Sequence, residues 1–454
     1  MIPKLFGTDG VRGEANAGVM TVENAVQIGR AIGLLCQRHH KHQRVRVLIG
    51  KDTRRSGYLF ENAMVAGLCS VGADAYVVGP LPTPGIAFMT VGIRADAGVV
   101  ISASHNPFAD NGIKVFGPDG YKLPDELEAQ IERWVAQPQP LQAALATGAD
   151  IGRAYRLDDA WGRYTVKLKT TFPNDLTLDG VKIAVDAANG AAYKVAPMVL
   201  EELGAEVVLL GAKPDGKNIN EQCGALHPQA LAKAVVDQGC HIGLALDGDA
   251  DRLVLVDEKG RIVDGDHIMA LCAPRMKIRG ELRGHAVVAT VMSNFGLEMA
   301  LREHGIALLR TDVGDRHVVG AMRKGGYSLG GEQSGHLVFL DHATTGDGVL
   351  AALQVLAIAV REQRPVSELA QAMTTIPQVL INLPVRDKPP IASLAAVSGA
   401  ISDVTQQLQG FGRVLVRYSG TEKKCRVMVE GQDEDSVRRY AERIASSVQS
   451  AIGV

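Results

Sequence analysis

Hydrophobic and polar positions alternate along the chain in a unit that recurs three times. Each unit opens with a short β-branched run that ends in a loop containing Gly or Asn, which predicts a buried strand followed by a turn. These runs are RVRVLIGKDTR (44–54), VKIAVDAANG (181–190) and HAVVATVMSNFG (285–296). A helical pattern follows each run, at Glu61–Ser70, Tyr193–Leu203 and Gly296–His304.

Two further strands are predicted in each unit. A Gly opens the second strand, in GADAYVVG (72–79), GAEVVLLG (204–211) and GIALLRT (305–311). The third segments are AGVVISASHNP (97–107), HIGLALDGDADR (241–252) and YSLGGEQSGH (327–336). Strands that alternate with helical patterns indicate crossover connections and mixed, largely parallel sheets. The sequence therefore predicts three related α/β domains.

The third segments end in polar loops at equivalent positions of their repeats. These loops are SASHNP, DGDADR and GEQSGH. Because ligands of open α/β sheets bind beyond the carboxyl ends of the strands, each loop is a candidate binding element. If the three domains face one another, all three loops line one central cleft.

The pattern changes after Pro365. Residues 412–431 are typical of a hairpin and Glu434–Ile452 of an amphipathic helix, which predicts a smaller C-terminal α+β domain. We read 137–148 as a linker and 256–266 as a turn between domains. The expected domains are 1–155, 156–256 and 257–370, which carry the three loops in turn, and 371–454.

Composition agrees with this organisation. A chain of 454 residues suggests three or four domains, and its core needs no disulfide or metal to hold the fold. The 46% hydrophobic content excludes a disordered chain, and the net charge of −2 argues against a broadly basic nucleic-acid binder.

Cysteine usage and hydropathy favour a cytoplasmic protein without a membrane partner. The six cysteines are scattered and form no CxxC pair, which suits a reducing compartment. The opening MIPKLFGTDGVRG has no apolar signal region, and the apolar run Gly348–Val360 is shorter than the about 20 residues that a bilayer span needs.

The segment Asp247-Gly-Asp249-Ala-Asp251-Arg252 places carboxylates at alternate positions of a loop, where they can converge on one hard cation. An EF-hand is excluded because Arg252 stands where that loop needs Gly and because the flanks are strands. Three carboxylates without further protein ligands suit Mg²⁺, which completes its shell with water and phosphate oxygens. The alternative is an acidic turn between strands.

The segment Ser102-Ala-Ser104-His105-Asn106-Pro107 offers a serine nucleophile beside a histidine at a strand end. The alternative is an ordinary loop, since Ser and Asn readily bond to nearby backbone. The segment contains no GxSxG elbow, so a hydrolase triad is not supported.

Two other loops are candidates for ligand binding. Arg417-Tyr-Ser419-Gly420-Thr421-Glu422, with Arg426 beyond it, resembles an anion cradle, because Gly exposes backbone N–H groups and Arg binds phosphate in a bidentate manner. The alternative is a hairpin turn with solvated arginines. The polar loop 331–336 could bind hydroxyl groups, and GTDGVRG (7–13) could bring a cation into a site.

Together, LFGTDGVRG, ISASHNP, DGDADR, GGEQSGH and RYSGTE resemble the α-D-phosphohexomutase superfamily, in its order and over essentially the whole chain. Two features distinguish this chain within that superfamily. Gln333 stands where related phosphomannomutases and phosphoglucomutases commonly have Met, and Lys423-Lys424 follow the phosphate loop where Pro is frequent. Gln333 and the LFGTDGVRG opening favour the branch that acts on glucosamine phosphates.

The resemblance implies a role for each loop. Ser104, rather than Ser102, would carry phosphate and contribute a metal-binding oxygen. The implied metal ligands are Asp247, Asp249 and Asp251. The implied sugar and phosphate contacts are His105, Glu332, Ser334, Arg417, Ser419, Gly420, Thr421 and Arg426. Arg12 and Lys114 would assist near the serine, and His336 would transfer a proton.

The implied reaction interconverts glucosamine 6-phosphate and α-glucosamine 1-phosphate through a phosphoserine enzyme and a 1,6-bisphosphate, and supplies UDP-N-acetylglucosamine synthesis. The implied cofactors are one Mg²⁺ per chain, phosphate on Ser104, and glucose or glucosamine 1,6-bisphosphate as activator. A kinase or a bisphosphate donor would install the first phosphate, and a homodimer is compatible with the resemblance. The alternatives are a phosphomannomutase or phosphoglucomutase, a phosphatase using the same serine, and a non-catalytic phosphosugar-binding protein.

Overall fold

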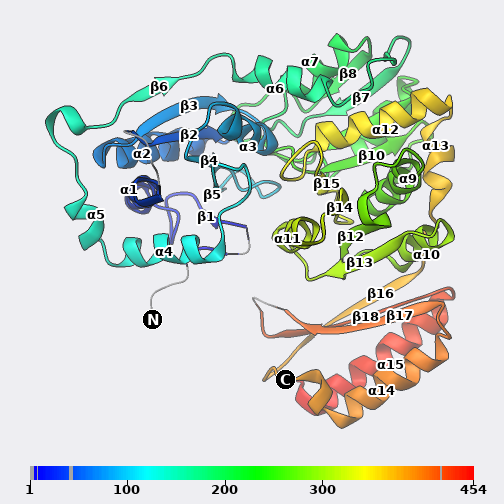
Figure 1. Ribbon diagram of the computed structural model, residues 1–454. Helices are drawn as coiled ribbons and strands as arrows, with labels where there is room; N and C mark the ends of the chain where they lie inside the picture. The colour runs from blue at the N-terminus through cyan, green and yellow to red at the C-terminus, as the bar shows by residue number, and fades with distance from the viewer. Residues whose placement is uncertain (1–4, 8, 40–43, 420–421) are drawn as a thin grey trace.

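The computed structural model describes residues 5–7, 9–39, 44–419 and 422–454. Within them the chain forms four sheets that follow one another along the sequence, each with its own helices (Figure 1). The first three sheets are mixed and the fourth is antiparallel. The predicted fold class, three related α/β domains and a smaller α+β domain, is confirmed.

The first sheet lies between helices on both faces. Its strand order is β1 (Val11–Glu14), β5 (Asp110–Phe116), β4 (Ala97–Ile101), β2 (Arg46–Lys51), β3 (Asp74–Pro80) and β6 (Ala154–Arg156). Its helices are α1 (Val22–His39), α2 (Arg55–Ser70), α3 (Thr83–Gly92), α4 (Asp125–Ala136) and α5 (Gln139–Ala143). Val47 packs in the cluster with α1, α2 and α4, and Leu48 packs with α3. Since successive strand residues face opposite sides, a strand covered on both sides reads as one apolar run.

The second sheet has the order β11 (Ile262–Val263), β10 (Leu253–Asp257), β9 (Ile242–Leu246), β7 (Lys182–Asp186) and β8 (Glu206–Leu210). Its helices are α6 (Ala160–Lys169), α7 (Val195–Glu202) and α8 (Gln229–Asp237). The third sheet has the order β13 (Ala307–Thr311), β12 (Ala286–Thr290), β14 (Leu329–Gly331) and β15 (Leu337–Phe339). Its helices are α9 (Gly265–Ile278), α10 (Phe295–Glu303), α11 (Asp315–Gly325), α12 (Gly348–Glu362) and α13 (Val366–Leu369).

The three α/β units share one topology. The orders β3-β2-β4-β5, β8-β7-β9-β10 and β13-β12-β14-β15 correspond strand by strand, with three parallel strands and an antiparallel fourth. The predicted first, second and third strands of each repeat are all present. The antiparallel fourth strand was not part of the predicted repeat. In each unit the polar loop connects the third strand to this fourth strand.

Details of the predicted elements differ at their ends. Helix α2 begins at Arg55 rather than at Glu61, whereas α7 and α10 lie within two residues of their predicted bounds. The linker 137–148 contains α5, and the turn 256–266 contains β11, which pairs with β10 in the second sheet. Two-residue strands and single helical turns are too short to give a hydrophobic period.

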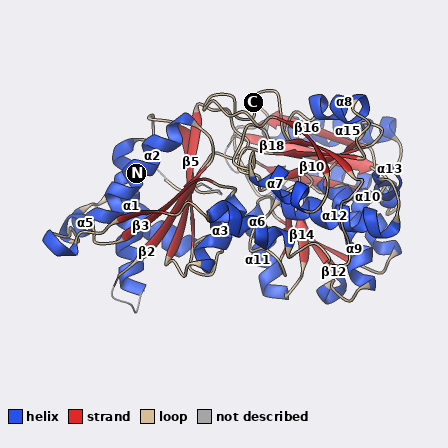
Figure 2. Cartoon of the chain, turned by 90° about the horizontal axis from the view of Figure 1, so that it is seen from above, coloured by secondary structure: helices blue, strands red, loops and turns tan. Residues whose placement is uncertain are grey.

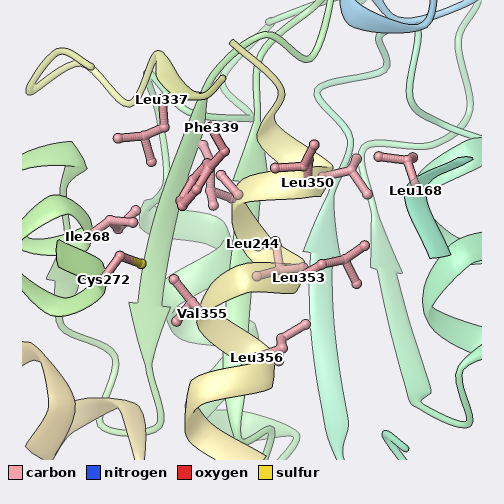
Figure 3. Close-up of a cluster of buried hydrophobic side chains, with 14 of the residues drawn as sticks. Leu168, Leu244, Ile268, Cys272, Leu337, Phe339, Leu350, Leu353, Val355 and Leu356 are labelled. Atoms are coloured by element: carbon pink, nitrogen blue, oxygen red, sulfur yellow. The ribbon is translucent and has the colours of Figure 1, made fainter. Parts of the chain in front are cut away.

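Helix α12 is the centre of a core that joins the first three units. Figure 3 shows Leu350, Leu353, Val355 and Leu356 of this helix among side chains from α6, β9, β15 and α9. The same cluster continues to Leu48 in the first sheet. A helix that is apolar around most of its circumference is buried on most sides, which is why α12 can serve two sheets at once.

The C-terminal unit has a separate core. Its sheet has the order β16 (Gln378–Pro384), β18 (Lys424–Gly431) and β17 (Gly412–Tyr418), covered by α14 (Ala395–Gln407) and α15 (Glu434–Ile452). The predicted hairpin and final helix are confirmed. Figure 2 shows the first sheet standing apart from the sheets of the other three units. Among the described residues, the helices lack the length and apolar character that a membrane span requires.

Candidate active site

The loops that follow β4, β9 and β14 meet in space. Ser104 in the first loop donates from Oγ to Asp247 Oδ2 in the second loop, at 2.7 Å. Arg252 in the second loop and His336 in the third form an antiparallel backbone bridge. Loops that occupy equivalent positions in their repeats are thus in direct contact, and they join three domains.

Ser104 is buried, and its backbone has a φ of 52°. This left-handed conformation is uncommon for a residue with a side chain and persists where neighbouring groups hold it. Its N–H donates to Ser102 Oγ at 2.9 Å, and that hydroxyl donates to the buried Asp52 at 2.6 Å. Ser102 therefore anchors the loop, whereas Ser104 faces the aspartates.

Arg54 binds the backbone of the loop that carries Ser104. Its fully buried guanidinium pairs with Asp52 and donates to the carbonyls of Ser104 and Asn106 at 2.9 and 2.8 Å. Asn220 of the second unit donates to the same two carbonyls at 2.9 and 3.0 Å. Sequence reasoning missed both residues. The signal for Arg54 was its place after β2, at the strand end neighbouring the serine loop.

Asp247, Asp249 and Asp251 form the predicted carboxylate cluster. One oxygen from each lies within 4.8 Å of the others, and all three residues are buried. Asp249 Oδ1 and Asp251 Oδ1 accept no hydrogen bond within the described part of the chain. Buried carboxylate oxygens without donors are what a hard cation would satisfy, so these residues fit Mg²⁺.

The three carboxyls differ in their electrostatic surroundings. Burial, together with the charges of Asp251 and Asp249, raises the pKa of Asp247 well above its ordinary value. Burial acts in the same direction on Asp251, but Lys114 and His336 outweigh it and hold the pKa of that carboxyl low. The ionised form of Asp247, the aspartate next to Ser104, is therefore disfavoured unless a cation lies beside it, whereas Asp251 is held ionised.

Lys114 lies on β5 with its ammonium group against the aspartates. Its Nζ is 3.0 Å from Asp249 and 3.5 Å from Asp251, and it also pairs with Asp9 at 3.3 Å. Burial alone would lower the pKa of Lys114, but these carboxylates have the larger and opposite effect. The pKa is therefore raised, and the group is cationic. Because Asp9 also pairs with Arg12, the contact between Asp9 and Lys114 brings Arg12 to the site.

Two more groups surround the serine. His105 Nδ1 lies 3.3 Å from Ser104 Oγ. Burial and the cations Arg252 and Arg12 lower the pKa of His105 to about 4, so this imidazole is neutral at pH 7. Nε of Arg12 and Nε of Arg252 are buried without a hydrogen-bond partner among the described residues. Arg252 was considered in the sequence only as a residue that excludes an EF-hand.

His336 is buried between two carboxylates, with Nδ1 3.7 Å from Asp251 and Nε2 3.8 Å from Asp315. Burial lowers the pKa of His336, but Asp251 and Asp315 outweigh it and raise the pKa to about 9. The Gly346 N–H points at Nε2 from 3.1 Å, which instead favours a proton on Nδ1 alone. Since Nε2 accepts from Gly346, we assign Nδ1, which faces Asp251, as the protonated nitrogen.

The remaining predicted residues of the third loop lie beside His336. Glu332 accepts from the Gly314 N–H at 3.0 Å and from the Ser334 hydroxyl at 3.3 Å. Ser334 is exposed and Glu332 is partly exposed. Both side chains are therefore accessible to hydroxyl groups of a ligand.

The predicted phosphate loop belongs to the C-terminal unit and touches the third unit. Arg417 lies opposite Arg426 in the sheet register and has Nη2 3.6 Å from Met292 Sδ. Burial and the charge of Arg426 lower the pKa of Arg417. Ser419 is buried and accepts from the Glu422 N–H at 3.2 Å. Gly420 and Thr421 lie outside the described residues.

The site thus assembles in two parts. The serine, carboxylates, Lys114, Arg12 and His336 are linked by direct contacts among the first three units. Within the described ranges, the two arginines of the phosphate loop do not contact Ser104. Arg417 lies against Met292 of the third unit, and Arg426 lies near Glu422 of the C-terminal unit. Like charges that face each other across a strand pair destabilise the sheet, so an anion between them would be favourable.

Family models of the phosphoglucomutase/phosphomannomutase proteins match the chain in four segments. The α/β/α domains I, II and III match residues 3–141, 163–260 and 264–376, and the C-terminal domain matches 380–447. The chain is 56% identical to the phosphoglucosamine mutase of Geobacter sp. (strain M21) over 450 residues, which cover 99% of this chain and 98% of that protein.

Solved structures agree on the fold. A phosphoglucomutase/phosphomannomutase family protein from Burkholderia thailandensis has a TM-score of 0.81 at 24% identity and covers 100% of both chains. Aspergillus fumigatus N-acetylphosphoglucosamine mutase, in complex with GlcNAc-6P and magnesium, has a TM-score of 0.67 at 18% identity over 99% of this chain and 96% of that one. Because all four family domains match and the 56% identity extends over nearly the whole chain, the chain belongs to the phosphoglucomutase/phosphomannomutase family, in the group of phosphoglucosamine mutases.

Proposed function

We propose that this chain interconverts glucosamine 6-phosphate and α-glucosamine 1-phosphate, with Ser104 as the phosphate carrier. The observation that carries the proposal is the 2.7 Å contact between Ser104 Oγ and Asp247, beside two further buried carboxylates. The 56% identity to a phosphoglucosamine mutase supports the choice of sugar.

The proposed reaction has two phosphoryl transfers. A sugar hydroxyl attacks phosphorus, the bond between phosphorus and Ser104 Oγ breaks, and the hydroxyl proton is lost. The resulting 1,6-bisphosphate turns over and returns its other phosphoryl group to Ser104. His336 is the proposed proton-transfer residue, since it is a buried imidazole in the third loop with two carboxylates beside it.

Charge compensation is the main task of the surrounding residues. Asp247, Asp249 and Asp251, with an oxygen of the phosphate on Ser104, would hold one Mg²⁺ per chain. When bound, that ion offsets negative charge on the transferring phosphoryl group. Lys114 and Arg12 lie on the serine side and would stabilise the same charge, and neutral His105 would accept a hydrogen bond from the substrate or from Ser104.

The C-terminal unit would hold the phosphate that is not reacting. Arg417 and Arg426 supply the positive charge of this proposed cradle, and Ser419, Gly420 and Thr421 supply its hydroxyl and backbone donors. Glu332 and Ser334 would bind sugar hydroxyls from the third unit. The proposed domains 1–155, 156–256, 257–370 and 371–454 thus contribute one loop each.

Other properties follow from the same assignment. The ligand is a small phosphosugar, and glucose or glucosamine 1,6-bisphosphate would activate the enzyme by donating the first phosphate, as an alternative to a kinase. All six cysteines are free, which is typical of a reducing compartment and supports a cytoplasmic location. A homodimer stays a prediction, which sedimentation analysis tests, and we propose neither a nucleic-acid nor a membrane partner.

Phosphopeptide mapping coupled to turnover tests the proposal. After incubation with glucose 1,6-bisphosphate, the wild type should carry phosphate on Ser104, and Ser104→Ala should lose both the phosphate and nearly all turnover. Ser102→Ala is the matched control, because it removes a hydroxyl that anchors the loop without facing the aspartates. Its phosphate should remain on Ser104. Full activity of Ser104→Ala would contradict the proposal.

Parallel assays separate the substrates. Turnover should be fastest with glucosamine phosphates and slower with glucose or mannose phosphates. Net release of inorganic phosphate at the rate of turnover would instead identify a phosphatase, and faster turnover of mannose phosphate would identify a phosphomannomutase.

A further inference from the structure

Lys122 connects the first and third units beside the candidate active site. It follows β5 in the first unit, and its side chain is 13% exposed. Its Nζ pairs with Asp9 of the first unit, and lies 2.5 Å from Asp315 at the start of α11 in the third unit. One ammonium group thus pairs with two carboxylates that belong to different domains.

Each of these carboxylates reaches a predicted catalytic group. Asp9 pairs with Arg12 and with Lys114 beside the aspartate cluster. Asp315 lies 3.8 Å from His336 Nε2. Lys122 itself touches none of the aspartates 247, 249 and 251 in any contact of the described residues, so its influence on the site passes through Asp9 and Asp315.

Packing alone does not fix the spacing of the two units here. Cavities of about 310 and about 290 Å³ lie along the interface between α11 and the first unit, and charged residues line both. Other contacts across this interface are ion pairs, from Arg316 to Asp125 and Glu128 and from Arg323 to Asp119. A hydrogen bond from Thr344 to the Gly120 carbonyl and a cation–π contact of Arg323 with Tyr121 also cross it. Elsewhere, the first three units share one apolar core.

Without the ammonium group, no cation would lie between the mostly buried carboxylates of Asp9 and Asp315, and Arg12 and Lys114 would offset charge on the Asp9 side only. Burial weakens solvent screening, so their repulsion would be substantial and would push the two units apart. Such a movement would separate Arg12 and Lys114 from His336, although these groups must act on the same phosphosugar.

We propose that Lys122 is a positioning residue that sets the distance between the serine side and the sugar-recognition side of the cleft. This inference rests on the proposed mutase function. Because the phosphate cradle and Glu332 lie outside the Asp9–Lys122–Asp315 contacts, loss of Lys122 should affect turnover more than substrate binding. A displacement of about 1 Å at reacting groups can cost about 100-fold in rate.

Steady-state kinetics of three single variants test the inference. Lys122→Met should lower kcat by roughly 10- to 100-fold with KM within about threefold of the wild type. Lys122→Arg, which keeps the charge, should recover most of kcat. Arg323→Gln is the matched control at the same interface, because it loses an ion pair that reaches neither Asp9 nor His336, and its kcat should stay within about twofold. Thermal midpoints of all variants establish that they are folded.

A double mutant isolates the electrostatic cause. Adding Asp315→Asn to Lys122→Met removes the repulsion and should restore part of kcat, so the two changes should be non-additive. Equal losses in Lys122→Met and Arg323→Gln would overturn the inference, as would a change in KM alone or a Lys122→Arg variant as slow as Lys122→Met. An inactive wild type would instead refute the proposed function, while phosphate on Ser104 in the slow variants would show that the serine side is intact.

Discussion

The buried charges of this molecule acquire their roles from particular neighbours. Asp247 and Asp251 come from one short motif, yet the pKa of the first is raised and that of the second is lowered. Lys114 and His336 contact Asp251, whereas Asp247 has Ser104 as its partner. Identical side chains in one loop are thus differentiated by residues from other domains.

Removal of a single carboxylate from the cluster should weaken Mg²⁺ binding. Asp247→Asn, Asp249→Asn and Asp251→Asn should each lose at least about 10-fold in Mg²⁺ affinity, since even loss of an outer-shell partner has that effect. Isothermal titration calorimetry with Mg²⁺ measures this directly. Asp237→Asn is a control, because this exposed carboxylate on α8 pairs with Lys233. Wild-type affinity in all three variants would return the motif to an acidic turn.

At the level of residues, the sequence indicated which side chains gather where chemistry and spacing coincide, while their roles stay predictions. The serine, the three aspartates and Arg12 occur in short motifs at strand ends, and the structure brings them together. Lys122 gave no such signal and Arg54 gave only its place after a strand, because a lone basic residue in a sequence resembles a solvated one. Their burial depends on carboxylates and carbonyls that are distant in sequence.

At the scale of elements, the hairpin β17–β18 sets two arginines against each other. Arg417 and Arg426 are register partners, and the sheet pays for this pairing unless an anion lies between them. The hairpin was predicted from its alternating pattern, whereas β16 was not, and β16 is the strand that places β18 at the centre of the sheet. Alternation identifies strands but not their order.

Arg417→Ala should weaken binding of both glucosamine 1-phosphate and glucosamine 6-phosphate. Loss of one charge-assisted contact costs about 1.5–3 kcal/mol, or roughly 10- to 150-fold in affinity. The variant should keep its thermal midpoint, because the change also relieves repulsion with Arg426. Calorimetric titration of both ligands measures the effect, with Arg438→Ala on the exposed face of α15 as control. Unchanged affinity for both ligands would remove Arg417 from the site.

The three repeats show what periodicity can predict about elements. The order of strand, helix, second strand and third strand with its polar loop could be predicted in each repeat, because buried strands and Gly-rich turns differ sharply in composition. The start of α2 at Arg55 could not be predicted, since the first residues of that helix include Tyr58 and Leu59 on an exposed face. Exposed apolar residues obscure the helical period.

At the scale of the whole molecule, some polar contacts between domains are buried within the shared apolar core. Tyr164 of α6 donates to Asp347, which caps the N-terminus of α12 by accepting from the Leu350 N–H. Both Tyr164 and Asp347 are buried beside the shared core. Burial raises the pKa of Asp347 to about 6, although the Leu350 N–H and the Tyr164 hydroxyl act in the opposite direction.

This raised pKa predicts a pH-dependent stability. The folded state binds the Asp347 proton more tightly than the unfolded chain, so the contribution is present below the ordinary pKa and is lost as the pH rises through about 6. The loss by pH 7 is about 3 kcal/mol. Asp347→Asn should lack it, with the Tyr164 hydroxyl turning to accept from the amide.

Unfolding by urea between about pH 4 and pH 7 tests the effect. The difference in unfolding free energy between the wild type and Asp347→Asn should change across this range. Asp341→Asn, at a more exposed carboxylate that pairs with Arg283, is the control. A difference that stays constant would show that Asp347 is ionised equally in the folded and unfolded states.

The distribution of apolar clusters has a consequence for how the chain loses its structure. One cluster runs through the first three units and α12, whereas the C-terminal unit has its own, joined to the third unit by polar contacts such as Arg413 with Ser293 and Phe295 with Glu430. Four domains therefore make two cooperative unfolding units. In native-state hydrogen exchange, β16, β17 and β18 should open together at a lower free energy than β7, β9 and β12, which open only with the whole.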